Sequence, residues 1–185
     1  RFVAAAGVEP DGTFEDGERV GATDVRAVDT PGHASDHVAF AVEEAPENGG
    51  DEEPSRALLC GDLAVADGSV VVGAPDGDLR EYLGSLRRVR EAEYDRLYPG
   101  HGPVVDDPSA VCDRLIEHRL ERERTVLAAV EGGATDVDAV VDAAYDKDLT
   151  GVADLARATV VAHLRKLLAE GRIDGKWAER LDRGE

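Results

Sequence analysis

Short apolar segments alternate with polar turns over roughly the first half of the chain, a pattern that is typical of β-strands. Each segment is bounded by glycine, proline or aspartate, which favour turns and end a strand. The pattern predicts strands at residues 25–28, 38–42, 57–60 and 97–98. A polar loop rich in acids, residues 46–54, is expected to join the second strand to the third.

Apolar residues then recur every three or four positions, which is the period of an amphipathic α-helix. One helix is predicted at residues 77–93, and a longer one through residues 111–130 that ends at a pair of glycines. Two shorter helices are expected beyond these glycines, through residues 137–144 and 155–168.

The C-terminal segment is expected to complete a winged helix-turn-helix. Residues 172–177 contain Asp174-Gly175, a pair that favours the two-residue turn of a β-hairpin. Two helices followed by a hairpin make up the winged-helix plan, and a plain helical cap remains the alternative. The sequence therefore predicts two domains, at residues 1–107 and 108–185.

The composition is strongly acidic. The 185 residues include 40 Asp and Glu against 21 Lys and Arg, a formal net charge of −19. The acids are spread along segments with apolar periodicity, so disorder is a poor explanation for them. An acidic chain rich in arginine, alanine and valine resembles proteins of salt-loving (halophilic) archaea, in which high charge keeps the protein soluble. A calcium buffer is the rival interpretation, but the sequence contains no EF-hand loop.

Several features favour a cytoplasmic location. No apolar run approaches the roughly 18 residues that span a bilayer, and no signal-peptide pattern opens the chain. Cys60 and Cys112 lie in apolar patterns outside any Cys-x-x-Cys, so both are expected to be buried thiols.

The chain contains no methionine and opens on Arg-Phe-Val-Ala-Ala-Ala, which is typical of the interior of an element. We therefore expect a fragment of a longer protein.

Three of the predicted turns carry side chains that coordinate metals. Each follows a strand within a few residues: His33 in Thr-Pro-Gly-His, Asp62 after a glycine, and His101 in Pro-Gly-His-Gly-Pro. Imidazole and carboxylate are the ligands that a hydrolytic zinc prefers, and loops at strand ends let distant residues converge. Each signal is weak alone, because these residues are common in turns. Together they predict a metal site.

In this order and at these spacings, the three motifs resemble the downstream metal motifs of the metallo-β-lactamase superfamily. The resemblance extends over essentially the whole chain, including Ile-Glu-His-Arg-Leu-Glu-Arg-Glu at residues 116–123, and points to glyoxalase-II-like thioesterases and winged-helix-tailed relatives. It implies an α/β (α+β) fold, the C-terminal half of an αβ/βα sandwich. It also implies two zinc ions, one held by His33 and Asp62 and the other by Asp62 and His101, with Asp62 as the bridging, catalytic ligand.

The superfamily's His-x-His-x-Asp-His motif, which supplies further ligands to both ions, does not occur in the sequence. None of the 32 residues before His33 is a histidine. A catalytic zinc usually has three protein ligands, so we expect weak zinc binding and no catalysis by this chain alone. Half of a two-sheet sandwich also leaves one apolar sheet face without a partner layer, which favours a homodimer or pairing with the missing N-terminal half.

The resemblance leaves the substrate open. Cleavage of a thioester, ester or lactone by a metal-bound hydroxide suits the glyoxalase-like motif. Single-stranded RNA suits the relatives with a winged-helix tail, although a charge of −19 argues against a nucleic acid. A non-catalytic winged-helix module and a pseudo-enzyme are the rival classes. His37, His118 and Arg119 are further candidates for holding a ligand in place or contacting substrate, with a satisfied histidine and a solvated helix face as the alternatives.

Overall fold

The structure, a computed structural model, describes residues 12–45, 54–145 and 149–183. Most of the predicted polar loop, residues 46–53, lies outside these ranges, as does the opening segment of the chain, residues 1–11. None of the helices within the described ranges is long and apolar enough to cross a bilayer.

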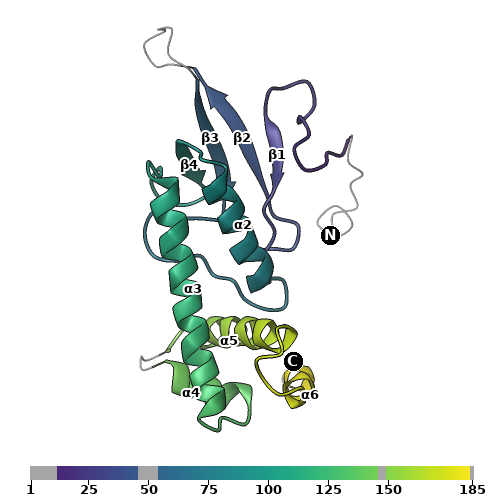
Figure 1. Ribbon diagram of the computed structural model, residues 1–185, viewed down its shortest axis with the longest axis vertical. Helices are drawn as coiled ribbons and strands as arrows, with labels where there is room; N and C mark the ends of the chain where they lie inside the picture. Colours follow the sequence, from purple (N-terminus) through teal and green to yellow (C-terminus); the bar gives the residue numbers. More distant parts are fainter. Residues whose placement is uncertain (1–11, 46–53, 146–148, 184–185) are drawn as a thin grey trace.

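Within these ranges the chain forms four strands and five helices (Figure 1). Each predicted strand is confirmed to within a few residues, and so is each of the four predicted helices. In chain order the elements are β1 (Arg26–Asp29), β2 (Val38–Glu44), β3 (Ser55–Gly61), α2 (Leu79–Glu91), β4 (Arg96–Pro99), α3 (Pro108–Glu131), α4 (Val137–Ala144), α5 (Ala153–Ala169) and α6 (Lys176–Arg183).

The strands form one mixed sheet in the order β1-β2-β3-β4. β2 is antiparallel to both of its neighbours, whereas β3 and β4 are parallel and are connected through α2. It follows that β1, β3 and β4 all run in the same direction and end at the same edge of the sheet. The turns that carry His33, Asp62 and His101 follow these three strands, so the topology brings them to one edge.

One face of the sheet is covered by α2 and by the first half of α3 (Figure 1). The side chains of α2 that recur every three or four residues point into this core, and Tyr82 and Leu86 are completely buried there. Leu58 and Cys60 meet them from the sheet. On the opposite face of β3, Leu59 is 44% exposed.

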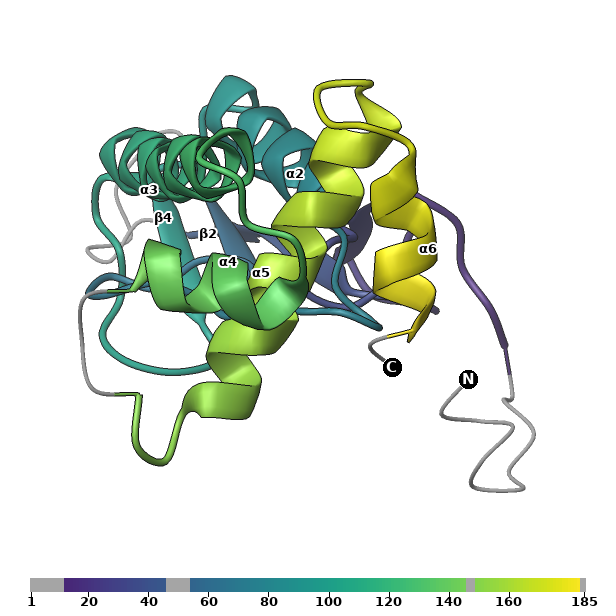
Figure 2. The same cartoon turned by 90° about the horizontal axis from the view of Figure 1, so that it is seen from below.

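A second apolar cluster lies among the helices that follow the sheet. Seen from below, α5 lies between α4 and α6 (Figure 2). Because α3 supplies Leu115 to the first cluster and Val126 to the second, this single helix runs through both. The predicted domain boundary at residues 107 and 108 stays a prediction.

The predicted β-hairpin at residues 172–177 is wrong, because these residues form no strand and α6 begins at Lys176. The Asp174 carboxylate accepts a hydrogen bond from the backbone N–H of Lys176 at 2.9 Å, as an N-terminal helix cap does. Trp177 and Leu181, four residues apart and therefore on one helix face, are both buried in the second cluster. In residues 149–183 the structure therefore has no wing, and the helical alternative describes this region.

Candidate metal centre

The side chains of His33, Asp62 and His101 converge at the sheet edge. The distance from His33 Nε2 to Asp62 Oδ2 is 3.9 Å, and the distance from His101 Nε2 to Asp62 Oδ1 is 3.7 Å. These distances are too long for direct hydrogen bonds, which rarely exceed about 3.2 Å. With metal–ligand bonds of roughly 2.0–2.2 Å, two ligand atoms on one zinc lie about 3.4 Å apart in tetrahedral geometry and at most about 4.2 Å apart. Each carboxylate oxygen therefore faces one imidazole at a separation that an intervening ion can occupy.

The orientation of His33 is set by a backbone group that sequence reasoning missed. Its Nδ1 lies 2.7 Å from the carbonyl oxygen of Val71, in the segment between β3 and α2. A carbonyl oxygen only accepts hydrogen bonds, so Nδ1 carries a hydrogen, and in the neutral tautomer that this contact selects the lone pair is on Nε2. Metal-bound histidines are usually held in this way. The acceptor is a main-chain oxygen, which leaves no mark on the side-chain pattern.

His37 holds the backbone of Asp62. The Asp62 N–H donates to His37 Nε2 at 3.3 Å, and His37 Nδ1 lies 3.1 Å from the carbonyl oxygen of Thr30. Since Nε2 accepts, Nδ1 must carry the hydrogen and donate it to Thr30. Burial lowers the pKa of His37, which favours this neutral form at neutral pH. His37 thus lies against the backbone of a candidate ligand, and the role expected for it from the sequence stays a prediction.

Two glycines allow the turns to approach so closely. Gly61 has a φ of +52°, and a Cβ there would lie 2.9 Å from His37 Nε2. Gly100 donates its N–H to the Gly61 carbonyl oxygen at 2.9 Å, and its own Cβ would lie 3.3 Å from Asp62 Oδ1. The turns after β3 and β4 are therefore tied together at the carboxylate, and larger residues would separate them.

The donor set fits half of a two-metal site. Imidazole and carboxylate suit zinc, and one carboxylate between two imidazoles suits a bridging ligand. In the part of the chain that the structure describes, however, no three His, Cys, Asp or Glu side chains are grouped so as to hold a single ion. Each ion would therefore receive two protein ligands from the described residues.

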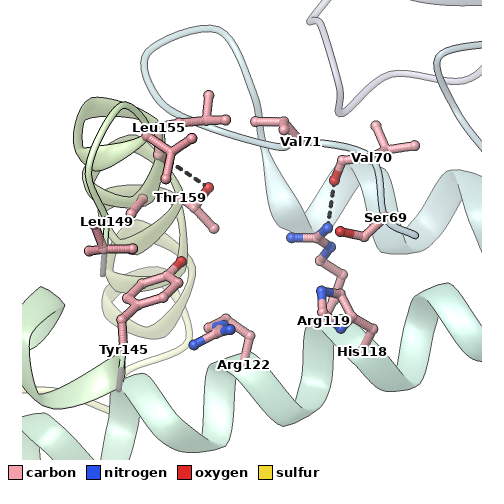
Figure 3. A pocket seen from close by; sticks show the side chains of 12 residues that line it. Ser69, Val70, Val71, His118, Arg119, Arg122, Tyr145, Leu149, Leu155 and Thr159 are labelled. Carbon is pink, nitrogen blue, oxygen red and sulfur yellow. Dashed lines mark hydrogen bonds between the residues drawn. The ribbon is translucent and has the colours of Figure 1, made fainter. Parts of the chain in front are cut away.

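His118 and Arg119 lie on α3 and line a pocket of about 330 Å³ (Figure 3), which adjoins the candidate metal site at Val71. The pocket is bounded by α3, by α5 and by residues 69–71. Val71 belongs to both places, because its carbonyl oxygen contacts His33 while the residue lines the pocket. Sequence reasoning singled out two of the lining residues, but it gave no role in a site to Arg122 or Tyr145.

Comparison with known proteins identifies the family. No protein-family model matches the chain. The Beta-lactamase-like protein 2 homolog of Caenorhabditis elegans is 32% identical over 178 residues, which cover 94% of this chain and 55% of that protein. A crystal structure of a metallo-β-lactamase family protein from Thermus thermophilus superposes with a TM-score of 0.67 at 27% identity, over 89% of this chain and 51% of that one. The chain belongs to the metallo-β-lactamase superfamily.

The superfamily assignment confirms the predicted family and fold class. Another relative, the Atrochrysone carboxyl ACP thioesterase of Aspergillus fumigatus, is 35% identical over 123 residues, which cover 66% of this chain and 34% of that protein. The chain thus spans about half the length of the first relatives it matches, or less. The identity of the metal and the roles of the candidate residues stay predictions.

Proposed function

We propose that the protein to which this chain belongs is a metal-dependent hydrolase that cleaves a thioester or a related ester or lactone. The observation that carries the proposal is the position of Asp62, whose two oxygens each face one imidazole nitrogen at 3.7–3.9 Å. One relative is named as a thioesterase, which favours a thioester among the ester-like substrates.

The residues of this chain prepare the site. Val71 keeps His33 Nε2 free to bind, and His37 fixes the backbone from which the Asp62 carboxylate projects. Bound divalent ions supply Lewis-acid catalysis and lower the pKa of water towards about 7. The Asp62 carboxylate is expected to bridge two such ions, so its removal affects both.

The number of ligands limits what this chain does alone. With two protein ligands for each ion, zinc is expected to bind weakly, and no geometry is fixed around an open position for water. We expect the 185-residue chain by itself to hydrolyse no thioester above background. A longer protein that adds a His-x-His-x-Asp-His segment upstream is expected to be active with zinc.

The test compares the longer protein with its Asp62→Ala variant. Thioester hydrolysis is followed with and without a chelator, and bound zinc is measured by elemental analysis. We expect Asp62→Ala to reduce turnover to background and to lower the zinc content. Asp67→Ala, an exposed acid in the loop after β3, is the matched control and should retain activity. Chelator-sensitive turnover that survives Asp62→Ala would refute the two-metal proposal.

A further inference from the structure

The pocket between α3, α5 and residues 69–71, beside the candidate metal site, has an unusual charge for this protein. Of the residues that the structure describes, twelve line it, and these twelve include His118, Arg119 and Arg122 but no aspartate or glutamate (Figure 3). The whole chain carries a formal net charge of −19, with 40 acidic residues. Within the described part of the chain, a small surface with two arginines and no acid is a local exception to the composition, and it requires an explanation.

The two arginines donate hydrogen bonds to main-chain carbonyls. Arg119 is 4% exposed, donates from Nη2 to the Val70 carbonyl oxygen, and its Nε has no hydrogen-bond partner. Arg122 donates from Nη1 to the Ala144 carbonyl oxygen, and its guanidinium carbon lies 4.2 Å from the centre of the Tyr145 ring. Throughout the described residues, no carboxylate forms an ion pair with either arginine.

A buried cation without an anion is unfavourable, because burial removes the water that would solvate it. The same burial lowers the pKa of Arg119. Each guanidinium has five N–H donors in a planar fork, and main-chain carbonyls occupy only part of them. The remaining donors are of the kind that binds a carboxylate or a phosphate through paired hydrogen bonds.

The wall of the pocket is apolar. Val71, Val152 and Leu155 line it and are 37%, 48% and 46% exposed, respectively. Exposed apolar side chains next to the buried Arg119 and the half-buried Arg122 suit a ligand that has both an oxyanion and an apolar part. A pocket volume of about 330 Å³ is within the range of small-molecule sites.

The pocket and the candidate metal site both contact the short segment Val70-Val71. The carbonyl oxygen of Val70 accepts from Arg119 in the pocket, and that of the next residue, Val71, accepts from His33 at the cluster. We propose that the pocket binds the oxyanion of a small, partly apolar substrate, a carboxylate or a phosphate, and so directs its scissile bond towards Asp62. The catalytic part of this inference rests on the proposed function, whereas the anion site itself does not.

Binding is tested on the 185-residue chain without metal, so the result does not depend on hydrolysis. Isothermal titration calorimetry compares phenyl phosphate, benzoate and the neutral benzamide. We expect at least one of the two anions to bind about tenfold or more tightly than benzamide, since hydrogen bonds to charged groups contribute about 1.5–3 kcal/mol. The relative affinities for phenyl phosphate and benzoate distinguish a phosphate-bearing from a carboxylate-bearing substrate.

Two pairs of variants locate the anion. Arg122→Gln is expected to weaken anion binding about tenfold. Arg124→Gln, on the same helix but exposed and paired with Glu117, should leave binding unchanged. Leu155→Glu adds a negative charge at the exposed wall and is expected to weaken anion binding about fivefold more than the neutral Leu155→Gln, which changes the apolar contact equally. Because Leu155 is exposed, this second pair tests the site even if Arg122→Gln fails to fold.

Several outcomes would overturn the inference. If benzamide bound as tightly as the two anions, the pocket would recognise only the apolar ring. If neither anion bound, the pocket would not be an anion site. Equal losses of anion affinity in Arg122→Gln and Arg124→Gln would mean that the anion is attracted by the general charge of the helix and not by this pocket. Binding of a short oligoribonucleotide but of neither small anion would assign the pocket to RNA. If the anion binds as expected but the longer, zinc-loaded protein hydrolyses no thioester, only the proposed function fails.

Discussion

Two carboxylates of this chain, Glu123 and Asp62, have opposite surroundings. The Glu123 side chain is 5% exposed, and its oxygens lie 2.6 Å from Lys166 Nζ and 2.6 Å from Arg172 Nη1. The Asp62 side chain is 43% exposed, and its oxygens lie 3.7 Å from His101 Nε2 and 3.9 Å from His33 Nε2. Glu123 is satisfied by the protein, so it joins α3, α5 and the segment after α5. Asp62 is fixed through its backbone, so its oxygens remain available to a ligand.

Contact distance and burial thus distinguish a carboxylate that stabilises the fold, Glu123, from one that remains a candidate ligand, Asp62. A buried carboxylate in direct contact with two cations contributes to folding only while its partners are present. An exposed carboxylate that faces two imidazoles without touching them contributes little to folding. Substitutions at the two positions should therefore affect different properties.

The largest effect on stability is expected from Glu123→Ala. The substitution leaves Lys166, which is 8% exposed, without one of its two carboxylates, and Arg172 without the Glu123 carboxylate. Breaking a buried pair in this way costs about 3–5 kcal/mol, measured as the free energy of unfolding in urea. Glu117→Ala on the same helix removes an exposed pair with Arg124 and should cost no more than about 1 kcal/mol. Equal losses would show that the contact distances and burial do not separate the two kinds of pair.

A second effect concerns His163, a buried group in the same helical region. Its ring nitrogens form no hydrogen bond with any residue that the structure describes, and burial lowers its pKa from 6.5 to about 3. Below pH 6.5 the unfolded chain binds a proton that the folded chain does not, so stability falls as the pH falls towards 3. The slope is about 1.4 kcal/mol per pH unit for one proton.

We therefore expect His163→Leu to be less sensitive to acid than the unmodified chain. The difference in unfolding free energy between variant and parent should shift by about 2 kcal/mol in favour of the variant between pH 7 and pH 5. Urea unfolding at several pH values measures it. Parallel pH profiles for the two proteins would mean that His163 is protonated in the folded state.

A smaller effect is expected at Gly61, where the backbone rather than a charge holds Asp62. Gly61→Ala introduces a Cβ at a φ of +52° and 2.9 Å from His37 Nε2, and should cost about 1–2 kcal/mol of stability. Gly84→Ala is the control, because this glycine lies within α2 with open space around it. It should stabilise by about 0.5–1 kcal/mol. A neutral or stabilising Gly61→Ala would show that the close approach to His37 is not required.

The smallest effect on stability is expected from Asp62→Ala itself. The carboxylate is 43% exposed and makes no direct hydrogen bond to a cation, so the unfolding free energy should change by no more than about 0.5 kcal/mol. Urea unfolding without metal checks this expectation. A loss comparable to that of Glu123→Ala would end the distinction between the two carboxylates.

The sequence predicted those parts of the molecule that local patterns determine. Strand alternation, helical periods and Gly-Pro turns placed the elements, and three turns at strand ends brought His33, Asp62 and His101 to the same edge. The hairpin prediction failed because an Asp-Gly pair favours a tight turn and an aspartate also caps a helix. Burial of Trp177 and Leu181 on one helix face decided between the two.

The pocket could not be predicted from local patterns. Its lining comes from segments far apart in the sequence, so no spacing indicates it. Arg119 and Arg122 lie in a helix with many Glu and Arg residues, where exposed ion pairs are the usual expectation. What distinguishes these two arginines is that no carboxylate among the described residues forms an ion pair with either of them, which only the tertiary structure shows.

The consecutive carbonyls of Val70 and Val71 have a thermodynamic consequence. One accepts from Arg119 and the other from His33, so a ligand that displaces this segment changes the hydrogen bonding of both. Two binding events that alter the same element have linked affinities, and the linkage is reciprocal. A substrate group that tightens metal binding at His33 must itself bind more tightly, by the same factor, when the metal is present.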